Sequence, residues 1–241
     1  MHNIHLPHVD STNTYAKKHA SAFPKGEITC VYADEQSAGR GREQKKWISP
    51  KNVNLYVTFF FQLPTNTLHL TTIGQVLSVS LARVLLAHHL SPELKWPNDV
   101  YLSGKKLAGI LCETEFQSSA VDLFLGIGIN VNMDDFSPID QPATSLFIET
   151  KTPWNKELLL QKLQSQFALD LELFRKQGFV PFQGFFNERL AFKDQKVRCQ
   201  QASKTWEGIC KCVDKTGQLE LRLTSGEIKT YSSGEISLRK V

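Results

Sequence analysis

Hydrophobic and polar positions recur with two different periods along the chain, and the periods predict where helices and strands lie. Apolar residues return every three or four positions over residues 68–89 and 154–178, which is typical of amphipathic helices. A shorter helix is predicted over residues 182–190. Apolar or alternating runs at residues 28–32, 53–63, 107–116 and 121–129 predict strands. Most of the chain therefore reads as helices packed on a sheet.

The pattern changes near residue 192. Five short alternating runs follow between Lys196 and Val241, separated by turn sequences such as Asp214-Lys-Thr-Gly217. Short strands at this spacing predict a small β-barrel. We therefore predict two domains, residues 1–191 and 192–241, with their boundary near Phe192.

A basic segment with two glycines lies between the first two predicted strands. Residues 36–47 read Gln-Ser-Ala-Gly-Arg-Gly-Arg-Glu-Gln-Lys-Lys-Trp. Glycines let the backbone approach a ligand closely, and the arginines and lysines suit an anion. We expect this segment to bind an anion and to stay mobile until its charge is met. A solvated surface loop is the alternative interpretation.

Polar groups also collect where other predicted elements begin. Asp10-Ser-Thr-Asn13 suits the start of a helix, and the same hydroxyls and amide can bind a polar ligand; the sequence does not separate these roles. Leu94-Lys-Trp-Pro-Asn-Asp99 predicts a strand end followed by a turn, with incidental polar residues as the alternative.

A predicted hairpin turn at Ser103-Gly104 precedes Lys106, which can present its ammonium group to a buried anion or stay in solvent. Gly126 and Gly128 lie inside the next predicted strand, where they indicate close approach of a ligand or of another backbone. Asn130 follows that strand.

Composition narrows the class of protein. A net charge of +4 agrees with anionic ligands but is too small for a protein that coats nucleic acid. The five cysteines lack Cys-x-x-Cys spacing, so they indicate neither a disulfide framework nor a zinc site. No signal sequence and no run of 18 apolar residues is present, so we expect a cytoplasmic protein without membrane association.

Six motifs occur in the order found in biotin protein ligases, and the chain resembles this family over essentially its whole length. The motifs are Asp10-Ser-Thr-Asn13, Gln36-Ser-Ala-Gly-Arg-Gly-Arg42, Lys95-Trp-Pro-Asn-Asp99, Lys106-Leu-Ala-Gly-Ile110, Gly126-Ile-Gly-Ile-Asn130 and Gly234-Glu-Ile-Ser-Leu-Arg239. The chain starts directly at the catalytic domain, so it resembles the monofunctional form that lacks a DNA-binding domain.

The resemblance implies a fold and a reaction. It implies an α/β (α+β) catalytic domain, with helices on a mixed β-sheet, followed by a small SH3-like β-barrel. It implies an ATP-dependent ligase that uses Mg²⁺ to convert biotin to biotinyl-5′-AMP. The biotinyl group then passes to a lysine of a biotin carboxyl carrier domain. The sequence leaves open whether the protein is a monomer or a homodimer.

The resemblance also assigns roles to individual residues. It implies catalytic roles for Lys106, Arg42 and Asp99, with Asp99 also a magnesium ligand. The implied biotin contacts are Ser11, Thr12, Asn13, Gln36, Gly39, Arg40, Gly41, Arg42, Lys106 and Gly109. The implied ATP contacts are Arg40, Arg42, Trp47, Asn130 and Arg239.

One departure from the family and two alternative functions matter. Some relatives continue the loop as Arg-Arg-Gly-Arg-Lys-Trp, whereas this chain has Arg42-Glu-Gln-Lys-Lys-Trp47. Glu43 therefore weakens the local positive field and Lys45 stands in place of a further arginine, which bears on how firmly the adenylate is retained. A lipoate or octanoate ligase is the alternative enzyme, although the Gly-Arg-Gly-Arg loop together with Lys-Trp-Pro-Asn-Asp favours biotin. A nucleic-acid-binding module is the alternative outside enzymes, but cations beyond the loop are interspersed with acids.

Overall fold

The computed structural model describes residues 1–201, 204–232 and 236–240. It divides into two compact units, each built from two separate stretches of the chain. Unit 1 comprises Met1–Thr67 and Lys105–Lys162, and unit 2 comprises Leu68–Gly104 and Leu163–Val241. The predicted boundary near residue 192 marks a different division and stays a prediction.

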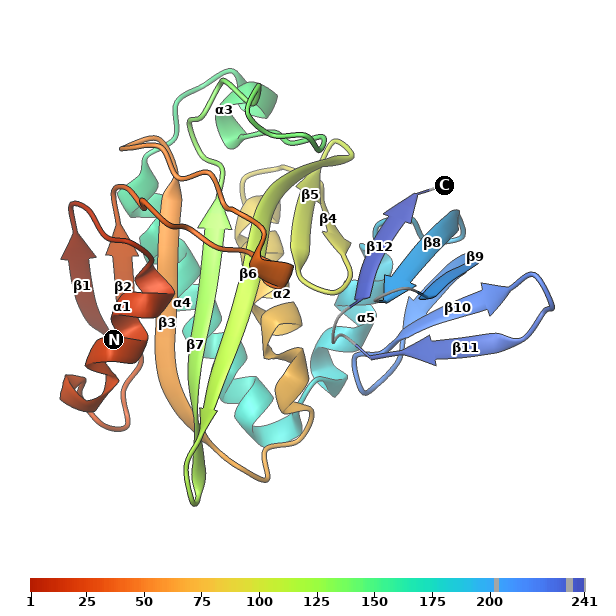
Figure 1. Cartoon of the computed structure of the whole chain (residues 1–241), viewed down its shortest axis with the longest axis horizontal. Coiled ribbons are helices and arrows are strands. Elements are labelled where there is room, and N and C mark those ends of the chain that lie inside the picture. The colour runs from red at the N-terminus through yellow and green to blue at the C-terminus, as the bar shows by residue number, and fades with distance from the viewer. Residues whose placement is uncertain (202–203, 233–235, 241) are drawn as a thin grey trace. The chain divides into compact units, whose positions relative to one another are not determined.

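Five strands of unit 1 lie side by side in the order β1-β2-β3-β7-β6 (Figure 1). Strand β1 pairs with β2 in parallel, and every other pairing within this set is antiparallel. The predicted mixed sheet is thus confirmed. The strands are β1 (His2–Leu6), β2 (Thr29–Ala33), β3 (Leu55–Pro64), β6 (Lys105–Phe116) and β7 (Ala120–Ile129).

Helix α1 (Thr12–His19), whose start was predicted from the polar residues Asp10–Asn13, packs on β2, β3 and β7. Beneath it lies an apolar cluster that includes Val31, Phe60 and Phe124. Short 3-10 turns η1 (Ala20–Ala22) and η2 (Arg42–Gln44) follow. The helix therefore covers one end of a sheet face and leaves the rest of that face for other contacts.

Two further helices begin in unit 1. The short α3 (Leu146–Thr150) was not predicted, because five residues are too few to display a helical period. Its start is capped by the Ser145 side chain, which accepts a hydrogen bond from the backbone N–H of Ile148. The predicted long helix is α4 (Lys156–Gln177), which continues into unit 2.

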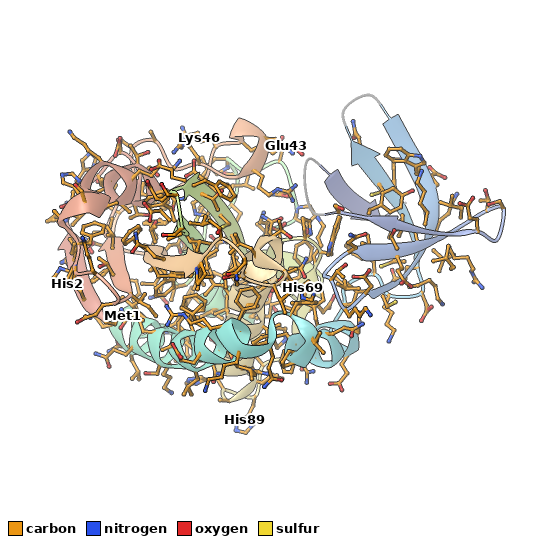
Figure 2. All side chains as sticks on the ribbon, turned by 90° about the horizontal axis from the view of Figure 1, so that it is seen from below. Met1, His2, Glu43, Lys46, His69 and His89 are labelled. Atoms are coloured by element: carbon orange, nitrogen blue, oxygen red, sulfur yellow. The ribbon has the colours of Figure 1, made fainter. Side chains whose placement is uncertain are left out.

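Unit 2 centres on α2 (Ile73–Leu86), which contacts β4 (Pro92–Lys95), β5 (Asp99–Leu102) and α5 (Val180–Glu188). Helix α2 is shorter than the predicted span of residues 68–89. His69, labelled in Figure 2, takes a left-handed conformation with φ of 57°, and the turn η3 (Leu70–Thr72) follows it. The chain therefore becomes α-helical only at Ile73.

The predicted strands after residue 192 form an antiparallel sheet in the order β11-β10-β9-β8-β12. They are β8 (Lys196–Gln201), β9 (Lys204–Val213), β10 (Leu219–Leu223), β11 (Ile228–Tyr231) and β12 (Ile236–Lys240). The β9–β10 turn is tied to other parts of unit 2, because Gly217 O accepts hydrogen bonds from Gln75 Nε2 at 2.9 Å and Trp96 Nε1 at 3.1 Å. The predicted fold class is confirmed.

Two general features complete the description. None of the five cysteines, all of which lie in the described ranges, forms a disulfide bond, and Cys30, Cys199 and Cys210 are buried. Across the described ranges, none of the helices combines the length and apolar character that crossing a membrane requires.

A buried carboxylate in unit 2 gives a test of the fold. Asp170 in α4 is 2% exposed, accepts hydrogen bonds from Ser80 Oγ at 2.7 Å and Gln166 Nε2 at 3.1 Å, and forms an ion pair with Arg83. We expect Asp170→Ala to lower the free energy of unfolding by about 3 kcal/mol, since it leaves the Arg83 guanidinium without its carboxylate and Ser80 with Val76 O as its remaining acceptor. Urea unfolding measures this change.

Glu172→Ala is the matched control, because Glu172 lies on the same helix but pairs with Arg175 at an exposed position. Its cost should stay below about 1 kcal/mol. Equal losses in the two variants would contradict a special role for Asp170.

Candidate active site

Three glycines leave a flat stretch on one face of the unit 1 sheet. Gly109 on β6 is in register with Gly128 on β7, and Gly126 lies two residues before Gly128. A Cβ atom at Gly126 would lie 2.4 Å from Asn13 Oδ1, and one at Gly128 would lie 2.4 Å from Cε2 and Nε1 of Trp47. The close approach predicted at these glycines is therefore made by two side chains of the protein itself.

The start of α1 brings polar groups onto this face. Ser11, Thr12 and Asn13 are all at most 5% exposed. The hydroxyl of Thr58, on β3, lies 2.8 Å from Thr12 Oγ1 and 2.6 Å from Asn13 Oδ1. Ser11 is the N-cap residue, yet its side chain makes no capping hydrogen bond. Capping by Ser11 therefore does not explain why this polar group is buried.

Gln36 links α1 to the basic loop. Its Oε1 accepts a hydrogen bond from the backbone N–H of Thr12 at 3.0 Å, and its Nε2 donates to Ser49 Oγ at 3.0 Å. Ser49 Oγ in turn donates to the carbonyl of Trp47 at 3.1 Å. A Cβ atom at Gly39 would lie 2.6 Å from Ser49 Oγ, so glycine is required where the loop passes this chain of hydrogen bonds.

The loop crosses the sheet face over β7 and β6 (Figure 1), where Trp47 rests on the glycines. The backbone N–H of Trp47 donates to Gly39 O at 2.9 Å, and the backbone N–H of Gly41 donates to Lys45 O at 2.7 Å, so the loop has internal hydrogen bonds. Glu43 and Lys46 both lie at its exposed surface (Figure 2), and Glu43 forms an ion pair with Lys45 at 2.6 Å.

Glu113, on β6, is a charged residue of the site that the sequence interpretation missed. Its carboxylate accepts hydrogen bonds from Asn13 Nδ2 at 2.8 Å and from Lys17 Nζ at 2.9 Å, and it lies 3.7 Å from Arg40 Nη2. The positive charge of Arg40 is therefore partly neutralised by a carboxylate of the protein itself, whereas we expected the loop cations to be neutralised only by a ligand.

The ionisation of Glu113 follows from these contacts. Burial disfavours its charged form, but hydrogen bonds from Lys17 and Asn13 and the nearby charges of Lys17 and Arg40 outweigh burial. The pKa of the Glu113 carboxyl is consequently lower than usual. The carboxylate is thus ionised at neutral pH.

A cavity of about 310 Å³ opens beside Trp47. Lys106 Nζ lies 5.5 Å from the centroid of a Trp47 ring, and Asn130 Nδ2 donates to Thr144 O at 3.0 Å. Three lysines and one aspartate are the charged residues among its walls, so the cavity favours an anion with a flat ring that can lie against Trp47. The residues that line it are Lys45, Lys46, Trp47, Ile48, Lys106, Asn130, Pro138, Ile139, Asp140, Gln141 and Ala143.

The structure brings most of the predicted site residues together within unit 1. Helix α1 and the basic loop share hydrogen bonds, and Gly109, Lys106 and Asn130 lie around Trp47. Arg42 opens the turn η2. Asp99, the first residue of β5, and Arg239, in β12, belong to unit 2. The side chain of Arg239, together with Gly234 and Glu235 of the last motif, lies outside the described residues.

Comparisons with known proteins agree on one family. The model of the biotin/lipoate A/B protein ligase family matches residues 6–130. The bifunctional ligase/repressor BirA of Escherichia coli is 34% identical over 97% of this chain and 73% of its own. The biotin–[acetyl-CoA-carboxylase] ligase of Paracoccus denitrificans is 31% identical over 92% of this chain and 94% of its own.

A solved structure extends the similarity to the fold. The biotin protein ligase of Aquifex aeolicus in complex with biotin and ATP superposes with a TM-score of 0.87 at 31% identity, covering 100% of this chain and 99% of that one. Both units of the present chain therefore have counterparts in that protein.

The contact between Gly128 and Trp47 gives a test of the site. We expect Gly128→Ala to displace Trp47, lowering the free energy of unfolding by about 1–3 kcal/mol and increasing acrylamide quenching of tryptophan fluorescence. Unfolding in urea and quenching titrations measure the two effects.

Gly184→Ala serves as the control, because no atom lies within 4 Å of a Cβ placed there. In a Trp47→Ala background the cost of Gly128→Ala should shrink, since the clashing ring is absent. The same cost in both backgrounds would show that Trp47 does not rest on Gly128.

Proposed function

Because the chain belongs to the biotin/lipoate A/B protein ligase family, we propose that it activates biotin with ATP and transfers it to a lysine of a biotin carboxyl carrier domain. Its relatives place it among the ATP-dependent biotin ligases. The observation that carries the proposal is the juxtaposition of two sites on one sheet face. A cluster of buried polar side chains at the start of α1, Thr12 and Asn13 with Thr58, lies on the same face of β7 as Trp47, whose indole ring lines a basic cavity.

The polar cluster at α1 suits the head group of biotin. The ureido ring of biotin offers two N–H donors and one carbonyl acceptor, and buried hydroxyl and amide groups recognise such a ring by hydrogen bonds. Thr12, Asn13 and Gln36 supply these groups, and all three are held by hydrogen bonds of their own. We assign the biotin contacts to Ser11, Thr12, Asn13, Gln36, Gly39, Arg40, Gly41, Arg42, Lys106 and Gly109.

The basic cavity suits ATP. Trp47 offers a flat apolar ring for the adenine, and Lys106 places an ammonium group 5.5 Å from that ring. Arg40, Arg42 and Asn130 complete the ATP contacts of unit 1 in this assignment. Arg239 is assigned to the phosphates from the family resemblance alone.

Magnesium fits the proposal without a dedicated cage. Among the described residues, no group of three or more His, Cys, Asp or Glu side chains is arranged to hold a metal ion. Mg²⁺ commonly takes only one or two carboxylates from a protein, with phosphates and water as its other ligands. Asp99 would hold it together with the phosphates of ATP, and the ion would neutralise charge on the departing pyrophosphate.

The residues of the chain have definable tasks in both steps. In the first step a biotin carboxylate oxygen bonds to the α-phosphorus of ATP, and pyrophosphate leaves. Lys106 and Arg42 stabilise the negative charge that gathers there, and a closed loop excludes water from the acyl-phosphate. In the second step the neutral amine of the carrier lysine attacks the acyl carbon, the bond from that carbon to the phosphate oxygen breaks, and AMP and one proton from the amine leave. Asp99 orients that amine in our proposal.

Exchange of labelled pyrophosphate into ATP tests this function and separates it from the alternative enzyme. We expect exchange that depends on biotin and is not supported by lipoate or octanoate. Exchange with lipoate alone would identify the alternative ligase. Retention on DNA at moderate salt would favour the nucleic-acid-binding module instead.

The remaining assignments rest on the sequence. The domain boundary at residues 191/192, the carrier domain as partner, the absence of DNA and membrane partners, and a cytoplasmic location stay predictions. The choice between monomer and homodimer also stays open.

Lys106→Ala and Arg42→Ala should each reduce biotin-dependent pyrophosphate exchange by about 100- to 1000-fold, because each removes a cation aimed at developing charge. The unfolding transitions should change little. Lys105→Ala is the matched control, since the adjacent Lys105 is exposed whereas Lys106 is half-buried. Exchange at the wild-type rate in either purified variant would refute the corresponding role.

Asp99→Asn should leave biotin binding largely intact and slow the transfer step, because a neutral amide cannot orient an amine or a metal ion as a carboxylate does. Single-turnover transfer from preformed biotinyl-5′-AMP to an acceptor domain isolates this step. An unchanged transfer rate would rule out the assigned role.

A further inference from the structure

The carboxylate of Glu113 joins two parts of the proposed biotin site that lie far apart in the sequence. It accepts a hydrogen bond from Asn13 Nδ2 at 2.8 Å, across 100 residues of chain, and it lies 3.7 Å from Arg40 Nη2 in the basic loop. One carboxylate therefore bonds Asn13 of the buried polar cluster at α1 and lies close to Arg40 of the basic loop.

Arg40 is held loosely. Its Nη2 donates to Thr14 Oγ1 at 3.1 Å, whereas the 3.7 Å separation from Glu113 is longer than a hydrogen bond. Its Nε is buried and has no hydrogen-bond partner among the described residues. A buried donor without an acceptor is unfavourable, so Arg40 gains from any anion that reaches it.

Glu113, by contrast, keeps its partners when Arg40 leaves. Lys17 Nζ donates to Glu113 Oε1 at 2.9 Å, and the stem of Lys17 lies near Phe124, with Nζ 5.8 Å from the ring centroid. Lys17 neutralises the carboxylate, and Asn13 supplies a second direct hydrogen bond. Loss of Arg40 therefore does not leave an unpaired buried charge.

We propose that Glu113 is a positioning residue whose carboxylate keeps Arg40 in place before ligand binds. Lys17 competes for the same carboxylate and so weakens the ion pair between Glu113 and Arg40, which allows Arg40 to leave Glu113 and pair with the ligand. This inference rests on the proposed function for the identity of the ligand anion, the carboxylate or phosphate of biotin and its adenylate. Glu113 also fixes the amide orientation of Asn13, because it accepts from Nδ2 while Oδ1 faces Thr58.

The arrangement predicts opposite effects for the two residues. Without the charge of Glu113, Thr14 is the only side chain among the described residues that still bonds the Arg40 guanidinium, so the loop should open more often. Without Lys17, the carboxylate depends on Arg40 for its neutralisation, so the loop should open less often and biotin should bind more weakly. A merely structural network would loosen in both variants.

Limited trypsin digestion of the full chain without ligand tests these signs, with cleavage after Arg40 followed by mass spectrometry. We expect Glu113→Gln to speed this cleavage about three-fold and Lys17→Gln to slow it about three-fold, the range set by partly exposed ion pairs. Calorimetric titration with biotin should show about three-fold weaker binding by Lys17→Gln. Biotin with ATP should suppress cleavage in the wild type.

Two further variants serve as controls. Lys18→Gln removes the same charge from the exposed neighbouring position on α1 and should leave cleavage unchanged. Lys17→Arg keeps the charge and should restore wild-type cleavage. If Glu113→Gln does not fold, Lys17→Gln carries the test alone, because its side chain is 29% exposed.

Faster cleavage in Lys17→Gln, or cleavage unchanged in both variants, would overturn the proposal. The ligand-free digestion does not depend on the reaction catalysed, so it separates this inference from the proposed function. A wild-type protein without biotin-dependent pyrophosphate exchange would refute the function while the digestion still decides how Arg40 is held.

Discussion

The glycines Gly109 on β6 and Gly126 and Gly128 on β7 allow other parts of the protein to pack directly against the sheet backbone. At Gly126 and Gly128 even a single methyl carbon would come within 2.4 Å of Asn13 or Trp47. The side-chain amide of Asn13 and the indole ring of Trp47 therefore lie directly on the sheet, and Trp47 holds its loop close to the backbone of β7. Lys106 also lies against this stretch, because a Cβ atom at Gly109 would come within 3.2 Å of its Nζ, and the cavity opens beside the same ring.

Charge compensation is the second constraint on this face. Cations brought together on a loop repel one another. Two carboxylates offset part of this repulsion: Glu43 pairs with Lys45, and Glu113 lies near Arg40. Partly buried pairs are less screened by salt than exposed pairs, so Glu113 has the stronger influence. Its depressed pKa keeps the carboxylate charged throughout the neutral range.

The sequence predicts elements better than it predicts contacts between them. The strands around Gly109, Gly126 and Gly128 and the helix after Asn13 could be predicted because each has its own period or its own end signal. Glu113 could not be singled out, since alternation along β6 shows only that it shares a face with Gly109 and says nothing of Asn13, 100 residues away. Thr58 was missed for the same reason, as a small polar residue in an apolar strand.

The start of α2 was placed too early because a left-handed His69 leaves no mark in the apolar period. Asp99 and Arg239 owe their assigned roles to family resemblance, because a role that depends on a ligand cannot be read from periodicity.

The long sequence separation within unit 1 has a consequence for how the protein is made. Strand β3 pairs with its sequence neighbour β2 on one side and with the distant β7 on the other, and Asn13 reaches Glu113 and Gly126 only after β6 and β7 exist. A ribosome builds chains from the amino terminus at about 5–20 residues per second, so the loop with its cations emerges several seconds before the strands that receive it. During that interval Trp47 and the apolar strand Leu55–Pro64 are exposed. The glycine face and the contacts of Trp47 and Asn13 on it can therefore form only after Ile129 has left the exit tunnel, late in synthesis.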